Sequence, residues 1–70
     1  MSEITSITEL GRVVQRARKR LGLTQSKLAL AAGVGVRFIV DLEAGKPTLR
    51  MQHVMRVVDV LGGKVVLDGL

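Results

Sequence analysis

The sequence of 70 residues has no cysteine, tryptophan or tyrosine, and its one aromatic side chain is Phe38. Without cysteine the chain can form neither a disulfide nor a thiolate metal site, a composition consistent with a cytoplasmic location. It also lacks a secretory hydrophobic segment and any apolar run long enough to span a bilayer. The core must therefore be built from aliphatic side chains.

The residues that usually carry catalysis are also scarce. There is one histidine, His53, and no pair of carboxylates is placed near a plausible nucleophile. Neither a phosphate-binding loop nor the spacing of metal ligands is present. We therefore expect a protein that is not an enzyme, that binds no cofactor or metal, and that carries His53 on its surface.

Positive charge and apolar side chains are what the sequence has in excess. The net charge is +5 and the pI is near 10.9, which favours a polyanionic partner such as DNA, RNA or an acidic membrane. The helical segments are short and their apolar faces are needed for a common core, which argues against binding to a membrane surface. The length suits one domain, and because 47% of the chain is apolar, part of that surface is expected to be buried against a second subunit.

The apolar periodicity of the N-terminal segment predicts a helix over residues 7–21. Ser6 and Glu9 form a capping box at its start, and Gly22 fits its C-terminal cap. The residues expected to face the core are Ile7, Leu10, Val13, Val14, Ala17 and Leu21.

Two shorter helices are expected over residues 25–32 and 36–44, with a hinge at Gly33. Thr24 can cap the first of them, and Gly33 can adopt the positive φ that a short turn between helices demands. The residues expected to pack inward are Leu28, Ala29, Ala32, Val34, Ile39 and Leu42.

A fourth helix is expected over residues 49–62, capped by Thr48 and ended by Gly62. The residues expected to face the core are Met51, Val54, Met55, Val58 and Leu61. Val57 and Val60 fall outside that stripe, so this helix is more apolar than one core requires.

The last segment, residues 63–70, contains a short β-type run, Lys-Val-Val-Leu-Asp. A single strand needs a partner and the sequence contains no second one, so we expect it to pair with the same strand of another subunit. The dimer interface is expected to include Val57, Val60, Val65, Val66 and Leu67. Residues 1–5 are expected to form a flexible arm.

Four short motifs occur in one register between residues 22 and 45: Leu-Thr-Gln, Leu-Ala, Gly-Val and Leu-Glu-Ala-Gly. With them the chain resembles, over about residues 6–62, the phage-repressor (Xre or Cro-type) helix-turn-helix family. The resemblance implies an all-α fold, a compact DNA-binding domain of four to five helices, here followed by the C-terminal strand. A plain helical hairpin with no role in DNA binding is the alternative, and the basic charge argues against it.

In that family the second short helix enters the major groove and the first lies across the DNA backbone. The resemblance implies that the residues facing the bases are Gly35, Val36, Arg37, Val40 and Asp41. Arg37 can bond to guanine and Val36 can contact a thymine methyl, whereas Asp41 can either accept from cytosine or pair with Arg37 one turn away. Both roles for Asp41 stay open.

Phosphate contacts are expected at the N-termini of two helices, where backbone N–H groups and the helix dipole favour anions. The candidates are Thr24 and Gln25 at one terminus and Lys46 and Arg50 around the other, with Lys27 as a weaker candidate.

Arg18 lies at the edge of the apolar stripe of the first helix. A half-buried guanidinium needs an anion, and Glu43, next to the core residue Leu42, is the best candidate. An arginine and a glutamate at the matching positions of phage-repressor-like domains form a buried pair, so the resemblance implies a structural ion pair between Arg18 and Glu43.

Further motifs are Gly-Leu-Thr-Gln, Val-Arg-Phe-Ile, Glu-Ala-Gly-Lys-Pro-Thr and the final Gly-Gly-Lys-Val-Val-Leu. They resemble the HipB-type antitoxins, which accompany HipA-like kinase toxins. This resemblance implies a homodimeric repressor that binds double-stranded DNA at an inverted-repeat operator, neutralises such a toxin and regulates its own operon. The alternatives are a stand-alone transcriptional regulator and a toxin-neutralising interaction module with little DNA binding.

Overall fold

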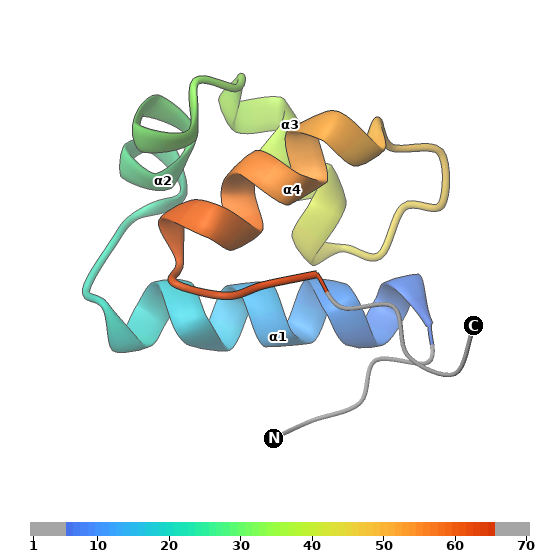
Figure 1. Cartoon of the computed structure of the whole chain (residues 1–70), viewed down its shortest axis with the longest axis horizontal. Coiled ribbons are helices and arrows are strands. Elements are labelled where there is room, and N and C mark those ends of the chain that lie inside the picture. The colour runs from blue at the N-terminus through green and yellow to red at the C-terminus, as the bar shows by residue number, and fades with distance from the viewer. Residues whose placement is uncertain (1–5, 66–70) are drawn as a thin grey trace.

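The computed structural model describes residues 6–65, and these residues form four α-helices (Figure 1). The helices are α1 (Ile7–Arg20), α2 (Gln25–Ala32), α3 (Val36–Glu43) and α4 (Met51–Val60). The predicted order and type of the helices are confirmed, and the described part of the chain contains no strand. Among residues 6–65, no helix has the length and apolar character needed to cross a membrane.

Local side-chain chemistry determines where α1 and α2 begin and where α2 ends. The Ser6 hydroxyl accepts from the backbone N–H of Glu9 at 3.1 Å, and the Thr24 hydroxyl accepts from that of Lys27 at 3.1 Å. Gly33 follows α2 with a φ of 69°, a left-handed conformation that glycine adopts without strain. The chain can therefore reverse within the short connection to α3.

α4 begins two residues later than its predicted start. Its N-cap is Arg50, whose carbonyl accepts from the N–H of Val54 at 3.1 Å, so the prediction of Thr48 as the cap is wrong. Leu49 packs against the core from outside the helix. The chain consequently stays non-helical from Lys46 to Arg50.

One core lies between the helices, because α3 packs against both α1 and α2 and α4 packs on α2. Its buried hydrophobic residues are Val14, Leu28, Ala29, Ala32, Ile39, Leu42, Val54 and Val57. Periodicity predicts all of them except Val57 as core residues. The assignment of Leu21 is wrong: this residue is 54% exposed, because α1 ends at Arg20 and Leu21 lies in the following turn.

α4 presents to the core a different face from the one its periodicity predicts. Met51 and Met55 are 62% and 50% exposed, whereas Val54 and Val57 are buried, Val57 completely. Apolar side chains surround most of this helix, so spacing alone does not select a face, and packing on α2 decides it. The assignment of Val57 to a dimer interface is therefore wrong, since its side chain is enclosed within its own chain.

Two further residues of α4 pack inward because the helix presents this face to the core. Val60, also expected at a dimer interface, is half-buried against the core. His53 is half-buried and meets the Phe38 ring edge to face, with centroids 5.3 Å apart and an interplanar angle of 85°. The prediction of His53 as a surface residue is wrong for that reason.

α1 and α3 approach each other closely at Gly11. A Cβ atom at this position would touch the carbonyl oxygen of Leu42 and lie 2.8 Å from that of Glu43. Backbone oxygens cannot move aside as a flexible side chain can, so the crossing needs a residue without a side chain. The sequence alone does not predict this role of Gly11, because a single glycine within a helical pattern does not identify its neighbour.

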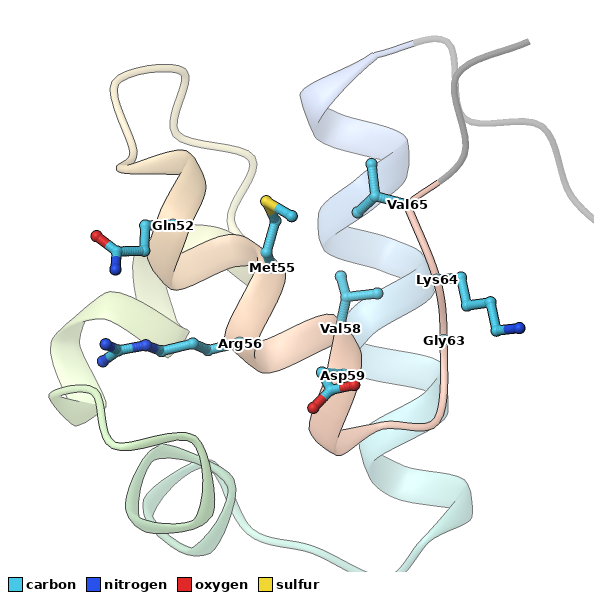
Figure 2. Close-up of a pocket in the computed structure, with 8 residues that line it drawn as sticks. All are labelled: Gln52, Met55, Arg56, Val58, Asp59, Gly63, Lys64 and Val65. Carbon is cyan, nitrogen blue, oxygen red and sulfur yellow. The ribbon is translucent and has the colours of Figure 1, made fainter.

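After α4 the chain turns at Gly62 and runs back beside α1 over residues 63–65 (Figures 1 and 2). Val65 is 51% exposed, and residues 63–65 are not in a strand. Val66 and Leu67 lie outside the described residues, so the expected pairing of two C-terminal strands stays a prediction.

Candidate nucleic-acid interface

α3 has a buried side and an exposed side. Ile39 and Leu42 are completely buried, which fixes the helix on the core. On the other side Val36 and Val40 are 46% and 36% exposed, and the side chain of Arg37 is 83% exposed. We call this surface the α3 face, and it consists of Gly35, Val36, Arg37 and Val40. It offers a ligand two apolar contacts, an unobstructed backbone at Gly35 and one guanidinium.

Asp41 lies beside the α3 face but is mostly enclosed, with a side chain that is 17% exposed. Its Oδ1 is 3.3 Å from Nε of Arg37, and its Oδ2 is 3.6 Å from Nζ of Lys46. Of the two roles left open by the sequence, the pair with Arg37 is the one formed here. Both carboxylate oxygens therefore face cations of the protein itself.

A buried ion pair joins α1 to the end of α3. Arg18 Nε donates to Glu43 Oε2 at 2.7 Å, and Nη2 donates to Oε1 at 3.1 Å. The same guanidinium donates from Nη1 to the carbonyl of Leu23 at 2.9 Å, and Gln25 Nε2 donates to Glu43 Oε1 at 3.2 Å. We call these four residues the ion-pair network. It ties α1, the α1–α2 loop, the start of α2 and the end of α3 together.

The ion-pair network also fixes the charge of Arg18. The hydrogen bond to Glu43 raises the pKa of the guanidinium above its ordinary value; burial opposes this, and the attraction of the opposite charge adds to it. Arg18 is therefore a permanent cation at every pH at which the protein is folded.

Comparison with known proteins identifies the family. The model of the Helix-turn-helix family, HTH_3, matches residues 14–66. The chain belongs to the helix-turn-helix family. An uncharacterized HTH-type transcriptional regulator of Sinorhizobium fredii (strain NBRC 101917 / NGR234), y4mF, is 49% identical to this helix-turn-helix protein over 59 residues, which make up 84% of this chain and 78% of that one.

Solved structures share the fold of this helix-turn-helix protein along nearly its whole length. A chain of the HipA-HipB-O2-O3 complex superposes with a TM-score of 0.88 at 23% identity, and a chain of the HipB-O4 20mer complex does so with the same values. In both cases the match covers 99% of this chain and 97% of the other. The helix-turn-helix unit itself consists of α2, the turn over residues 33–35, and α3.

The residues expected to contact phosphate lie at or near the N-termini of α2 and α4. Exposed side chains are carried by Thr24, Lys27, Lys46 and Arg50. The Thr24 hydroxyl already caps α2, and the half-buried Gln25 uses one amide hydrogen for Glu43. Gln25 retains its second amide hydrogen and its backbone N–H as donors.

Two contacts of this helix-turn-helix unit escaped sequence analysis. The backbone N–H of Lys46 donates to the carbonyl of Asp41 at 3.0 Å, and this fold of the chain after α3 brings the two side chains together. Helical periodicity does not describe such a loop. The contact between Gln25 and Glu43 had a usable signal, because a buried carboxylate can accept about four hydrogen bonds and an arginine in a bidentate contact supplies two of them.

Metal ligands do not gather anywhere in the described part of the chain. Among residues 6–65, no group of three or more His, Asp or Glu side chains could hold a metal ion.

Proposed function

We propose that this protein is a sequence-specific, DNA-binding transcriptional repressor whose α3 enters the major groove. The observation that carries the proposal is the exposure of Val36, Arg37 and Val40 on a helix whose other side is locked in the core. A helix anchored in this way presents its outer side chains in a fixed orientation, as base readout requires. Arg37 bonds a guanine edge, and the two valines contact thymine methyl groups.

The same docking brings two helix N-termini to the DNA backbone. The backbone N–H groups at the start of α2, together with Thr24 and Gln25, bind one phosphate region, and Lys46 and Arg50 bind another, with Lys27 nearby. These contacts set the register of α3 without reading sequence. The net charge of +5 adds a general attraction for DNA.

The first test is the Arg37→Ala variant, titrated against a duplex that the full chain has enriched from a randomised pool. In each half-site, loss of the guanidinium is expected to cost about 1–3 kcal/mol of binding free energy and to relax the preference at one base pair. Fluorescence anisotropy with the enriched duplex and its single-base variants measures both effects.

Lys46→Ala is the matched comparison for that titration. As a phosphate contact, Lys46 is expected to contribute equally to every duplex, so its removal weakens all of them alike and lowers the salt slope of binding by about one for each half-site. If Arg37→Ala left the enriched duplex bound as before, or weakened all duplexes uniformly in the manner of Lys46→Ala, the assignment of Arg37 to base readout would be wrong.

We also propose that the protein acts as a homodimer on an inverted-repeat operator. Support comes from a groove between α4 and the following segment, shown in Figure 2, where Met55, Val58 and Val65 gather. Met55 and Val65 are half-exposed in the single chain. In the sequence, Val65 is followed by two more apolar residues, Val66 and Leu67, so this end of the chain offers a second copy more apolar side chains than the groove alone.

Deletion of residues 64–70 tests the dimer. The truncated chain is expected to sediment as a monomer at micromolar concentration and to bind the enriched duplex at least about tenfold more weakly, since one half-site replaces two. Circular dichroism should show that the helices persist. A truncated protein that stays dimeric and binds normally would place the interface on α4 alone.

The partner that this account favours is a HipA-like kinase toxin, which would make the protein the antitoxin and autoregulator of its operon. Support comes from the resemblance of its motifs to HipB-type antitoxins and from the fold that it shares with chains of the HipA-HipB-O2-O3 complex. Co-expression with the product of the adjacent reading frame tests this. A stable complex with a kinase-like protein supports the antitoxin role, and a neighbour unrelated to kinases favours a stand-alone regulator.

A further inference from the structure

We propose that Asp41 is a positioning residue that increases discrimination between operator and other DNA by holding Arg37 and Lys46 in place. It acts through these two cations and does not itself contact a base. The inference deepens the proposed function and rests on it. Three side chains carry the argument, and all come from the last two turns of α3 and the residue after Gly45.

Each oxygen of the Asp41 carboxylate has a cation of the protein beside it. Arg37 Nε lies 3.3 Å from one oxygen, and Lys46 Nζ lies 3.6 Å from the other. The Asp41 side chain is 17% exposed, whereas those of Arg37 and Lys46 are 83% and 52% exposed. The carboxylate is thus enclosed beneath two cations that face outward. A cytosine amino group would have to displace one of them to reach it.

The contact with Asp41 orients the Arg37 guanidinium. Asp41 Oδ1 lies 3.3 Å from Nε, so the edge of the guanidinium formed by its two terminal nitrogens keeps N–H donors for a ligand. A guanine offers O6 and N7 side by side, which matches two such nitrogens in a bidentate contact. Held this way, Arg37 loses less conformational freedom on binding the correct base.

The same carboxylate weakens binding to DNA of any sequence. Attraction for phosphate depends on cations that are free to reach it, and Asp41 offsets part of the charge of both Arg37 and Lys46. The three side chains together carry one net positive charge, from two cations and one anion. On an operator the bidentate contact of Arg37 compensates for this loss, and on other DNA nothing does.

Asp41→Asn tests the inference, since it removes the charge and keeps the shape. Binding is measured by fluorescence anisotropy at several salt concentrations, with the enriched duplex and with a shuffled duplex of equal length and composition. For the shuffled duplex we expect affinity to rise about threefold or more and the salt slope to steepen by about 0.9 for each additional phosphate that the variant neutralises. The ratio of the two affinities should fall about tenfold, within the range of one lost bidentate contact.

Glu9→Gln is the control, because it removes one negative charge from α1 and replaces the carboxylate by an amide of nearly the same shape that can also hydrogen bond. It is expected to change both affinities by the same small factor and to leave their ratio unaltered. An equal fall of the ratio in Glu9→Gln and Asp41→Asn would overturn the inference, since net charge alone would then explain the effect.

Combining Asp41→Asn with Arg37→Ala separates positioning from direct readout. If Asp41 acts through Arg37, it should no longer alter base preference once Arg37 is absent, and the two effects should be far from additive. Additive effects, with a preference for one particular cytosine lost in Asp41→Asn, would make Asp41 a base reader and overturn the inference alone. A wild-type chain that shows no preference for any duplex would instead remove the proposed function together with this inference.

Discussion

Replacing Arg18 with methionine is expected to lower the free energy of unfolding by about 3–5 kcal/mol, the range observed when one partner of a buried ion pair is removed. The side chains of Arg18 and Glu43 are only 10% and 3% exposed, so water cannot solvate the carboxylate left behind. The carbonyl of Leu23 also loses a donor. A core in a chain of this size supplies about 3–5 kcal/mol in total, so the variant should be largely unfolded.

Urea denaturation followed by circular dichroism measures this effect. Arg16→Met is the matched control, because Arg16 is an exposed arginine on the same helix, and it should change stability by less than about 0.5 kcal/mol. Replacing both Arg18 and Glu43 with methionine should recover much of the loss, since no buried charge then remains unpaired. An Arg18→Met variant as stable as Arg16→Met would show that the ion-pair network does not hold α1 to α3.

Gly11→Ala is expected to destabilise the protein although alanine is the better helix former. The change gains about 1 kcal/mol of helix propensity. Against that gain, the new methyl group meets the carbonyl oxygens of Leu42 and Glu43, and α1 has to move away from α3. Overpacking typically costs about 1–3 kcal/mol, and a backbone obstacle places the cost here at the upper end of that range, so the expected net loss is about 2 kcal/mol.

Thermal unfolding monitored by circular dichroism tests the expectation for Gly11. Gly35→Ala is the comparison, because Gly35 has a φ of −74° and no atom within 4 Å of an added Cβ. Its cost should stay under about 1 kcal/mol, that of a less suitable N-cap. A Gly11→Ala variant more stable than the wild type would mean that α1 and α3 are not packed as closely as described.

The helix-turn-helix unit could be predicted from sequence almost to the residue. Thr24 and Gly33 mark the ends of α2 sharply, because one is a capping side chain and the other takes a positive φ. Ile39 and Leu42 lie three residues apart, which predicts that they share the inner side of α3, and both are completely buried. Local chemistry and periodicity agree over this stretch.

The orientation of α4 could not be predicted in the same way. Met51 and Met55 fit a helical stripe as well as Val54 and Val57 do, and only packing against α2 decides between them. The close approach at Gly11 depends on α3, which is distant in sequence. Both features arise from tertiary packing, which a single sequence does not encode in any local pattern.

In the candidate site, too, contacts with a local sequence pattern could be predicted and those that depend on the folding of a loop could not. Periodicity alone placed Arg18 at the edge of the core, and a buried cation needs an anion, so Glu43 could be chosen as its partner. The contact of Lys46 with Asp41 depends on how the chain folds after Gly45, and spacing along the helix carries no information about that loop.

The sequence of the DNA that the full chain enriches from a randomised pool tests the central claim most directly. Two α3 helices related by a twofold axis predict an inverted repeat, with half-sites centred about one helical turn, or ~34 Å, apart, and two chains bound to each duplex. Binding should weaken steeply with salt, and each half-site should contain a guanine whose replacement has no further effect in Arg37→Ala. Enrichment of no sequence at all, or of one without twofold symmetry, would contradict the account.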